Sequence, residues 1–183
     1  MVITDLIRVN TADLRRVIPE LRAGDRIALS GVVYTARDAA HKRLMGLLDA
    51  GETLPFPIRD SVIYYCGSTP APDGCVIGAC GPTTSGRMDP YTPRLYDLGL
   101  VATVGKGPRD AATRDAIRRN GGIYLCAVGG AGALAAQSVR QAEVIAFHDL
   151  GCEAIKRLVF ADFPLIVGED VRGGSLFYKK RLQ

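Results

Sequence analysis

Three short loops of this sequence each place one cationic side chain among glycines, prolines or hydroxyl groups. Arg37 lies just beyond the apolar segment 27–34, Arg87 ends the loop GPTTSGR at residues 81–87, and Lys106 stands between two glycines. Three hydroxyl groups accompany them, on Thr83, Thr84 and Ser85. An arginine can hold a carboxylate through two parallel hydrogen bonds, and a lysine adds a point charge. These residue types predict a binding site for a small dianion such as a dicarboxylate.

A structural explanation is open for some of these residues. Arg37 and Lys106, each taken alone, are also typical of exposed residues at a helix start or in a turn. The 81–87 loop is a stronger indication, because two glycines, a proline and three hydroxyls in seven residues are an unusual combination. His41 follows Arg37 by four residues, so it either supports a site on the same helix face or is an exposed helix residue.

Strands and helices alternate along most of the chain, and the cationic loops follow strands. Apolar β-rich runs predict strands at residues 27–34, 62–66, 75–79, 101–104 and 123–128. Helical spacing predicts helices at residues 11–21, 37–48, 89–98, 109–119 and 132–139. The rest is mostly β, with strands expected at 143–147, 153–160, 165–168 and 175–178, and a hairpin turn at 172–174. This order predicts a layered α/β domain with a mixed sheet, whose ligand site lies beyond the carboxyl ends of strands.

Composition narrows the class of protein. The chain has 183 residues, is 48% hydrophobic and 23% charged, and shows no interior boundary, so residues 1–183 are expected to form one domain. The net charge of +4 comes from cations scattered among acids, which does not indicate nucleic-acid binding. The uncharged stretch 121–139 contains five glycines and changes its period, so it predicts a strand, a turn and a helix rather than a membrane span.

The cysteines and histidines do not have the spacing of a metal site. Two histidines and five cysteines without a CxxC pair predict no metal ligands in this chain. Three cysteines lie in apolar runs and are interpreted as core residues: Cys66, Cys126 and Cys152. The sequence opens without a secretory pattern, so a reduced cytoplasmic protein is expected.

Two nucleotide-binding motifs are matched only incompletely. Residues 81–88 resemble a phosphate-binding P-loop but have Arg87 and Met88 where that loop needs Lys and Ser or Thr. Residues 130–135 fit the dinucleotide pattern GxGxxA, with Glu153 near the distance of a ribose-binding acid. No complete βαβ unit follows, and a glycine-rich helix start packed against a sheet explains the pattern more simply.

Five segments together resemble the β subunit of class I, iron–sulfur-dependent fumarate hydratase, a resemblance shared with L-tartrate dehydratase β subunits. They are SGVVYTARDAAHKRL (residues 30–44), YYCGSTPAP (64–72), GACGPTTSGRMD (78–89), VGKG (104–107) and GGIYLCAVGGAGAL (121–134). The segments occur in order over nearly the whole chain. The resemblance implies a swivelling β/β/α domain that works with a separate α subunit in a hetero-oligomer. It also implies that the α subunit holds a 4Fe–4S cluster and that the active site lies between the two parts.

The activity implied is the reversible hydration of fumarate to (S)-malate, with an iron of the cluster acting as Lewis acid. The resemblance carries Arg37, Thr83, Arg87 and Lys106 over as substrate-site residues, with Thr83 as the catalytic candidate near the C3 proton. The alternatives are the β subunit of L(+)-tartrate dehydratase, which converts tartrate to oxaloacetate, and a non-catalytic anion-binding or assembly module.

Overall fold

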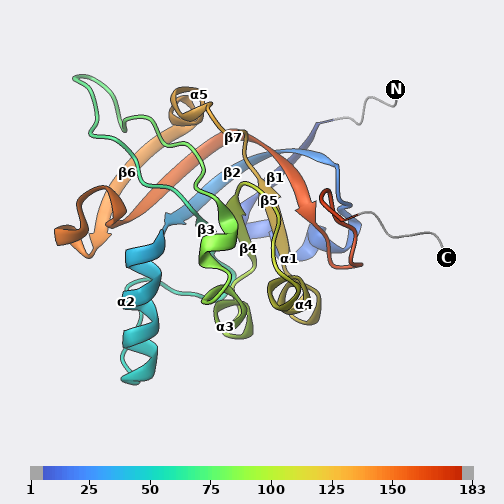
Figure 1. The fold of residues 1–183 in the computed structure, drawn as a ribbon. Coiled ribbons are helices and arrows are strands. Elements are labelled where there is room, and N and C mark those ends of the chain that lie inside the picture. The colour runs from blue at the N-terminus through green and yellow to red at the C-terminus, as the bar shows by residue number, and fades with distance from the viewer. Residues whose placement is uncertain (1–5, 179–183) are drawn as a thin grey trace.

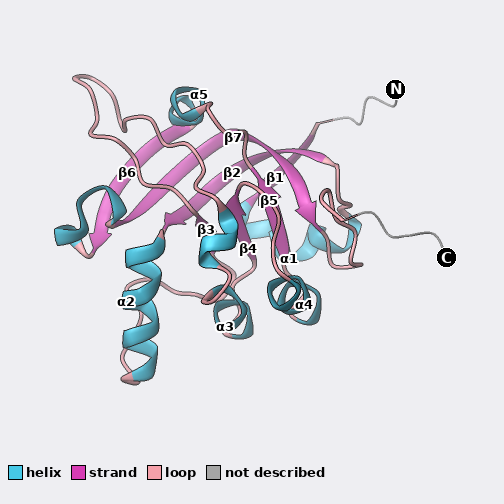
Figure 2. Ribbon diagram, in the orientation of Figure 1, coloured by secondary structure: helices cyan, strands magenta, loops and turns pink. Residues whose placement is uncertain are grey.

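A seven-stranded mixed sheet organises the computed structural model, which describes residues 6–178 (Figures 1 and 2). The strands are β1 (Ile7–Asn10), β2 (Arg26–Thr35), β3 (Val62–Tyr64), β4 (Ala102–Gly105), β5 (Ile123–Cys126), β6 (Val139–Ala146) and β7 (Ile155–Glu169). Strands β2 to β5 are parallel neighbours, and β7 pairs antiparallel with both β5 and β2. These pairings close β2, β3, β4, β5 and β7 into a ring, with β1 beside β2 and β6 beside β7.

Helical segments connect these strands. The α-helices are α1 (Leu14–Val17), α2 (Asp38–Asp49), α3 (Thr92–Asp97), α4 (Ala111–Arg119) and α5 (Gly132–Gln137). Four short 3-10 segments complete the order: η1 (Thr11–Asp13), η2 (Ile18–Glu20), η3 (Ser85–Met88) and η4 (His148–Glu153). Figure 1 shows α2, α3 and α4 together along one side of the sheet and α5 on the opposite side. No helix within residues 6–178 has the length and apolarity needed to cross a membrane.

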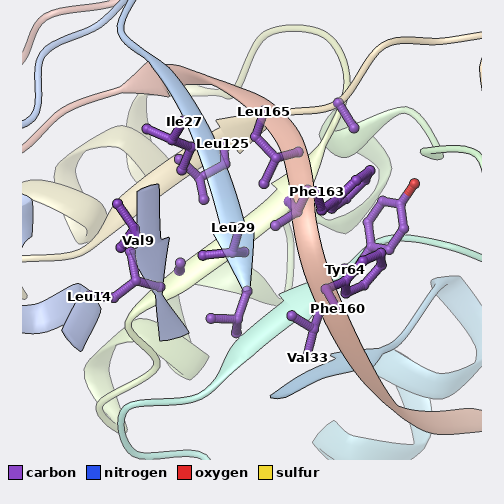
Figure 3. Packing of buried hydrophobic residues seen from close by; sticks show 14 of the residues in the cluster. Val9, Leu14, Ile27, Leu29, Val33, Tyr64, Leu125, Phe160, Phe163 and Leu165 are labelled. Carbon is purple, nitrogen blue, oxygen red and sulfur yellow. The ribbon is translucent and has the colours of Figure 1, made fainter. Parts of the chain in front are cut away.

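The side chains of the parallel strands point alternately to the two faces of the sheet, so the interior consists of two hydrophobic cores. Tyr64 and Leu125 point into the ring, where Figure 3 shows them with residues of β1, β2 and β7. Their neighbours Tyr65 and Tyr124 point to the other face and pack against α2, α3 and α4. Successive side chains of a strand face opposite sides, so a strand buried on both faces is apolar without interruption. This explains why runs such as VIYYC read as buried strands in the sequence.

The parallel strands bring the cationic loops to one edge of the sheet. Arg37 follows the end of β2, the 81–87 loop lies beyond the end of β3, and Lys106 follows β4. Because β2, β3 and β4 are parallel neighbours, their carboxyl ends lie side by side. The mixed sheet agrees with the sequence-based expectation. The 81–87 loop reaches the expected edge, but it does not follow a strand at residues 75–79 as expected.

Several expected elements are wrong in detail. Residues 75–79 form an irregular loop rather than a strand, residues 175–178 contain one isolated bridge, and residues 11–21 form three short helical pieces. β1 was not expected. The two strands expected at 153–160 and 165–168 are one strand, β7, which continues through Pro164. At that position β7 pairs only with β2, so the missing amide of proline faces an unpaired side.

Candidate functional site

Residues 82–84 connect the ends of two parallel strands. Pro82 pairs with Cys66 just beyond β3, and Thr84 pairs with Lys106 just beyond β4. Thr83 N donates to Tyr65 O at 2.7 Å, and Ser85 N donates to Lys106 O at 2.8 Å. This short extended segment therefore holds the threonines next to the backbone of Lys106.

An acidic side chain joins the two arginines. Arg87 Nε donates to Asp38 Oδ1 at 2.9 Å, and Arg87 Nη2 lies 2.8 Å from Asp38 Oδ2. Arg37 approaches the same carboxylate, with Nε 3.9 Å from Asp38 Oδ2, and its Nη2 lies 3.5 Å from Glu153 Oε1. Arg37 Nε is buried and has no hydrogen-bond acceptor within residues 6–178. The structure thus brings Arg37 and Arg87 together around Asp38, whose buried Oδ2 also makes no hydrogen bond within residues 6–178.

The local sequence explains the position of Arg37. It is the N-cap residue of α2, in an extended conformation, and its carbonyl accepts the first helical hydrogen bond, from His41 N at 2.8 Å. Its guanidinium lies against Gly67, where an added Cβ would come within 2.9 Å of Arg37 Nη1. A side chain at residue 67 would therefore displace Arg37, which gives this glycine a packing role.

Lys106 supplies the third cation. Its side chain is half-buried and lies beside the glycine-rich turn after β5, where a Cβ on Gly129 would lie 3.4 Å from Lys106 Cδ. The ion pairs at this edge of residues 6–178 involve Arg37 and Arg87, and Lys106 takes part in none of them. Its ammonium is therefore available to an anion.

The three hydroxyl residues of the loop have different surroundings. Thr83 is half-buried and Thr84 is exposed, so both are open to a ligand. Ser85 is fully buried, and its hydroxyl lies 2.9 Å from Tyr124 OH, which donates to Gly107 O at 2.8 Å. A side chain at residue 105 would collide with Ser85 Oγ, which explains the glycine before Lys106. Ser85 therefore orients the loop from inside the protein.

His41 is buried, so the expectation of an exposed helix residue is wrong. Its Nδ1 lies 2.9 Å from Arg37 O, and because a carbonyl can only accept, this nitrogen carries the proton. Burial lowers the pKa of His41 to about 4, so the ring is neutral. Its ring stacks on Tyr91, with centroids 5.8 Å apart. His41 thus supports the backbone of Arg37 and stays out of contact with solvent.

A buried ion pair behind the loop escaped the sequence analysis. Arg109 is fully buried, and its Nε donates to Asp89 Oδ1 at 2.6 Å. The other oxygen of Asp89 accepts from Asp110 N at 2.8 Å, at the start of α4. The remaining guanidinium nitrogens donate to the hydroxyls of Tyr65, Thr92 and Thr103. The sequence signal was the acid that closes GPTTSGRMD, but nothing local in the sequence connects it to a residue twenty positions later.

The structure corrects one of the three cysteines assigned to the core and the dinucleotide-binding motif. Cys66 and Cys126 are buried as expected, but Cys152 is exposed, which corrects its assignment to the core. Within residues 6–178 no group of three Cys, His, Asp or Glu side chains is arranged to hold a metal ion. Glu153 accepts from Ala39 N at 3.0 Å, and α5 leads to the antiparallel strand β6, so the dinucleotide alternative is wrong.

Comparison with known proteins identifies the family of this chain. The family model described as "Fumarase C-terminus" matches residues 3–180. Fumarate hydratase 2 of Leishmania major is 38% identical over 176 residues, which are 91% of this chain and 31% of that protein. The anaerobic class I fumarate hydratase of Escherichia coli is 39% identical over 174 residues, 90% of this chain and 32% of that protein. The chain therefore spans about a third of the length of these relatives.

A relative of similar length also exists. A Methanocaldococcus jannaschii protein named as an L(+)-tartrate dehydratase β subunit is 37% identical over 169 residues, which are 89% of this chain and 87% of that protein. All five segments that carried the resemblance lie inside the family match, and three of them, 30–44, 78–89 and 104–107, supply the cationic loops of the sheet edge. On the extent of that match, the chain belongs to the fumarase C-terminus family.

Proposed function

We propose that this chain is the β subunit of a hydro-lyase that reversibly hydrates fumarate to (S)-malate. The observation that carries the proposal is the gathering of Arg37, Arg87 and Lys106 at the carboxyl ends of three neighbouring parallel strands. Two carboxylates need more than one cationic partner, and the family match supports a dicarboxylate as substrate. In this proposal the chain supplies carboxylate-binding residues to a site shared with an α subunit.

The arginines would hold the substrate carboxylates. Asp38 contacts Nε and Nη2 of Arg87, which leaves the Nη1 side of that guanidinium for a ligand. The Arg37 side chain is 22% exposed, so a carboxylate could approach part of it. Lys106 adds a third positive charge, which would stabilise the negative charge that builds on the carboxylate when C3 loses its proton.

Thr83 is the proposed catalytic residue of this chain. Its side chain is half-buried between the ends of β3 and β4, whereas that of Thr84 is exposed. A hydroxyl is a poor base by itself, so Thr83 would need a partner that accepts the proton. We assign that partner to the α subunit, together with the 4Fe–4S cluster, because the described residues offer no ligand set for a cluster.

The finer structural assignments belong to the same proposal. The closed ring, with α2, α3 and α4 on one side, supports a swivelling β/β/α architecture for a single domain over residues 1–183. The five cysteines are free thiols, which fits the reducing cytoplasm.

Tartrate is the second candidate substrate, because the match to this chain covers 87% of the Methanocaldococcus relative that is named as a tartrate dehydratase β subunit. The test is anaerobic co-purification with the α subunit, followed by assays of malate and tartrate dehydration. We expect Arg37→Ala and Arg87→Ala to lower kcat/KM by about ten- to a hundredfold, the cost of one charge-assisted hydrogen bond. Arg94→Ala is the control, since Arg94 pairs with Asp49 on the helical side. A stable complex that dehydrates neither acid would refute the enzyme and favour an anion-binding module.

A further inference from the structure

An exposed uncharged segment borders the candidate site. Residues 127–139 contain no Asp, Glu, Lys or Arg. Val128 and Leu134 in this segment are 63% and 64% exposed, the highest values among the large apolar side chains of residues 6–178. Contiguous exposed apolar surface of this kind marks interaction sites in folded proteins.

The loop before the site extends this surface. Residues 68–79 carry a single charged residue, Asp73, and Val76 in this loop is 49% exposed. The loop packs beside α5, where Cys80 N donates to Gly132 O at 3.1 Å, and Figure 1 shows the two together on the side away from α2, α3 and α4. We call residues 68–79 and 127–137 the docking face.

Apolar hollows lie in the docking face. One of about 340 Å³ lies between the loop and α5, and its lining includes Val76, Ile77, Ala133 and Ala136. A second of about 170 Å³ is lined by residues that include Val128, Leu134, Phe163 and Pro164. Hollows lined by small and branched apolar groups can receive the side chains of a partner, and charged residues are depleted from the centres of protein interfaces.

The docking face is continuous with the candidate site. Gly129 lies beside Lys106, and a Cβ added to Gly81 would lie 3.4 Å from Gly132 Cα. The absence of side chains at these contacts lets the turn after β5 approach both cationic loops closely. A protein that covers the docking face would therefore also cover the carboxylate-binding edge.

We propose that the docking face binds the α subunit through apolar contacts and so closes the shared site. This inference rests on the proposed function, in which an α subunit completes the enzyme. The fumarate hydratase relatives are about three times as long as the region they share with this chain, so their remaining part needs a contact surface on this fold. The uncharged composition of the docking face indicates an apolar partner surface rather than an electrostatic one.

Two aspartate substitutions and one control test the proposal. Leu134→Asp and Val128→Asp each place a charge in the docking face at an exposed position. Leu98→Asp is the control, because Leu98 is 38% exposed at the end of α3, on the far side of the sheet in Figure 1. Each variant is co-expressed with the α subunit, the affinity of the complex is measured, and the melting temperature of the chain checks its fold.

We expect the two docking-face variants to weaken the complex by more than about tenfold and the control to leave it unchanged. In the wild-type complex, hydrogen exchange of residues 68–79 and 127–137 should slow relative to the free chain, a measurement that needs no variant. Unchanged affinity or unchanged exchange there would overturn the docking face and leave the proposed function standing. If the docking face is protected in a complex that has no dehydratase activity, the proposed function is overturned and the docking face stands. If the wild-type chain forms no complex with the α subunit, both proposals are overturned.

Discussion

Replacing Arg109 should destabilise the fold far more than replacing an exposed arginine with the same kind of partner. Arg109 contacts Asp89 with both side chains buried, 0% and 7% exposed. Arg119 contacts Asp97 through two hydrogen bonds of 2.9 and 2.7 Å, with side chains 49% and 47% exposed. The two pairs differ in burial, and Arg109 also donates to three buried hydroxyls that Arg119 has no counterpart for.

Burial sets the size of the effect. Arg109→Met leaves the Asp89 carboxylate inside the protein without its cation, and breaking a buried pair from one side costs about 3–5 kcal/mol. Arg119→Met leaves Asp97 in water, where an ion pair contributes about 0–1 kcal/mol. For a chain of this size, 1 kcal/mol shifts the melting temperature by about 2–4 °C. We expect a loss of about 6–20 °C for Arg109→Met and of at most about 4 °C for Arg119→Met.

Calorimetry or circular dichroism of the two variants measures this difference. The double variant Arg109→Met with Asp89→Asn removes both charges and keeps an acceptor for Asp110 N, so it should regain part of the lost stability. Equal losses in the two single variants would show that burial is not what makes the Arg109 pair important. A double variant less stable than Arg109→Met would refute the argument from the unpaired carboxylate.

Four further predictions concern single features. His41 is neutral in the fold with a pKa of about 4, while the unfolded chain takes up a proton near pH 6.5, so stability is complete above pH 6.5 and falls by about 3 kcal/mol toward pH 4. Denaturant titrations should show a flatter pH dependence in His41→Gln but not in the exposed control His148→Gln. Arg87→Lys should have a reduced kcat/KM in the complex, because lysine cannot contact Asp38 and a substrate carboxylate along two edges as arginine can. A near-normal kcat/KM would show that Arg87 does not hold a carboxylate in this way. Thr83→Val should lower kcat strongly and Thr84→Val less, with subunit assembly intact, and equal kinetic losses would show that Thr83 has no role in proton transfer. The chain purified alone should show no iron–sulfur absorption band, and a persistent band in the folded chain would contradict this expectation.

The sheet edge that gathers the cations could be predicted because its signals are local. An apolar run followed by glycine and a cation shows up within ten residues, and parallel strands place all such loops at one edge. The same rule failed at residues 75–79, where an apolar run lies in an irregular loop instead of a strand. Short apolar runs do not by themselves separate a strand from a buried loop.

The contacts that hold the site together are not local and could not be predicted. Asp38 meets Arg87 across 49 positions, and Arg109 meets Asp89 across 20. Glu153 was considered only as a ribose-binding acid, yet it lies beside Arg37 because η4 returns to the start of α2. Such pairs depend on the closure of the ring between β2 and β7, which joins segments more than a hundred residues apart.

The charges at the sheet edge explain why this chain should bind a dicarboxylate weakly when it is alone. Arg37, Arg87 and Lys106 are balanced in part by Asp38 and Glu153, so the group has a formal charge of +1. The two carboxylates prevent three cations from repelling one another in the free chain, but they also weaken the attraction for a dianion. A substrate with two negative charges would leave the site with a net charge of −1, which is costly once water is excluded. In the proposed complex, the α subunit on the docking face would be placed to supply a further positive charge.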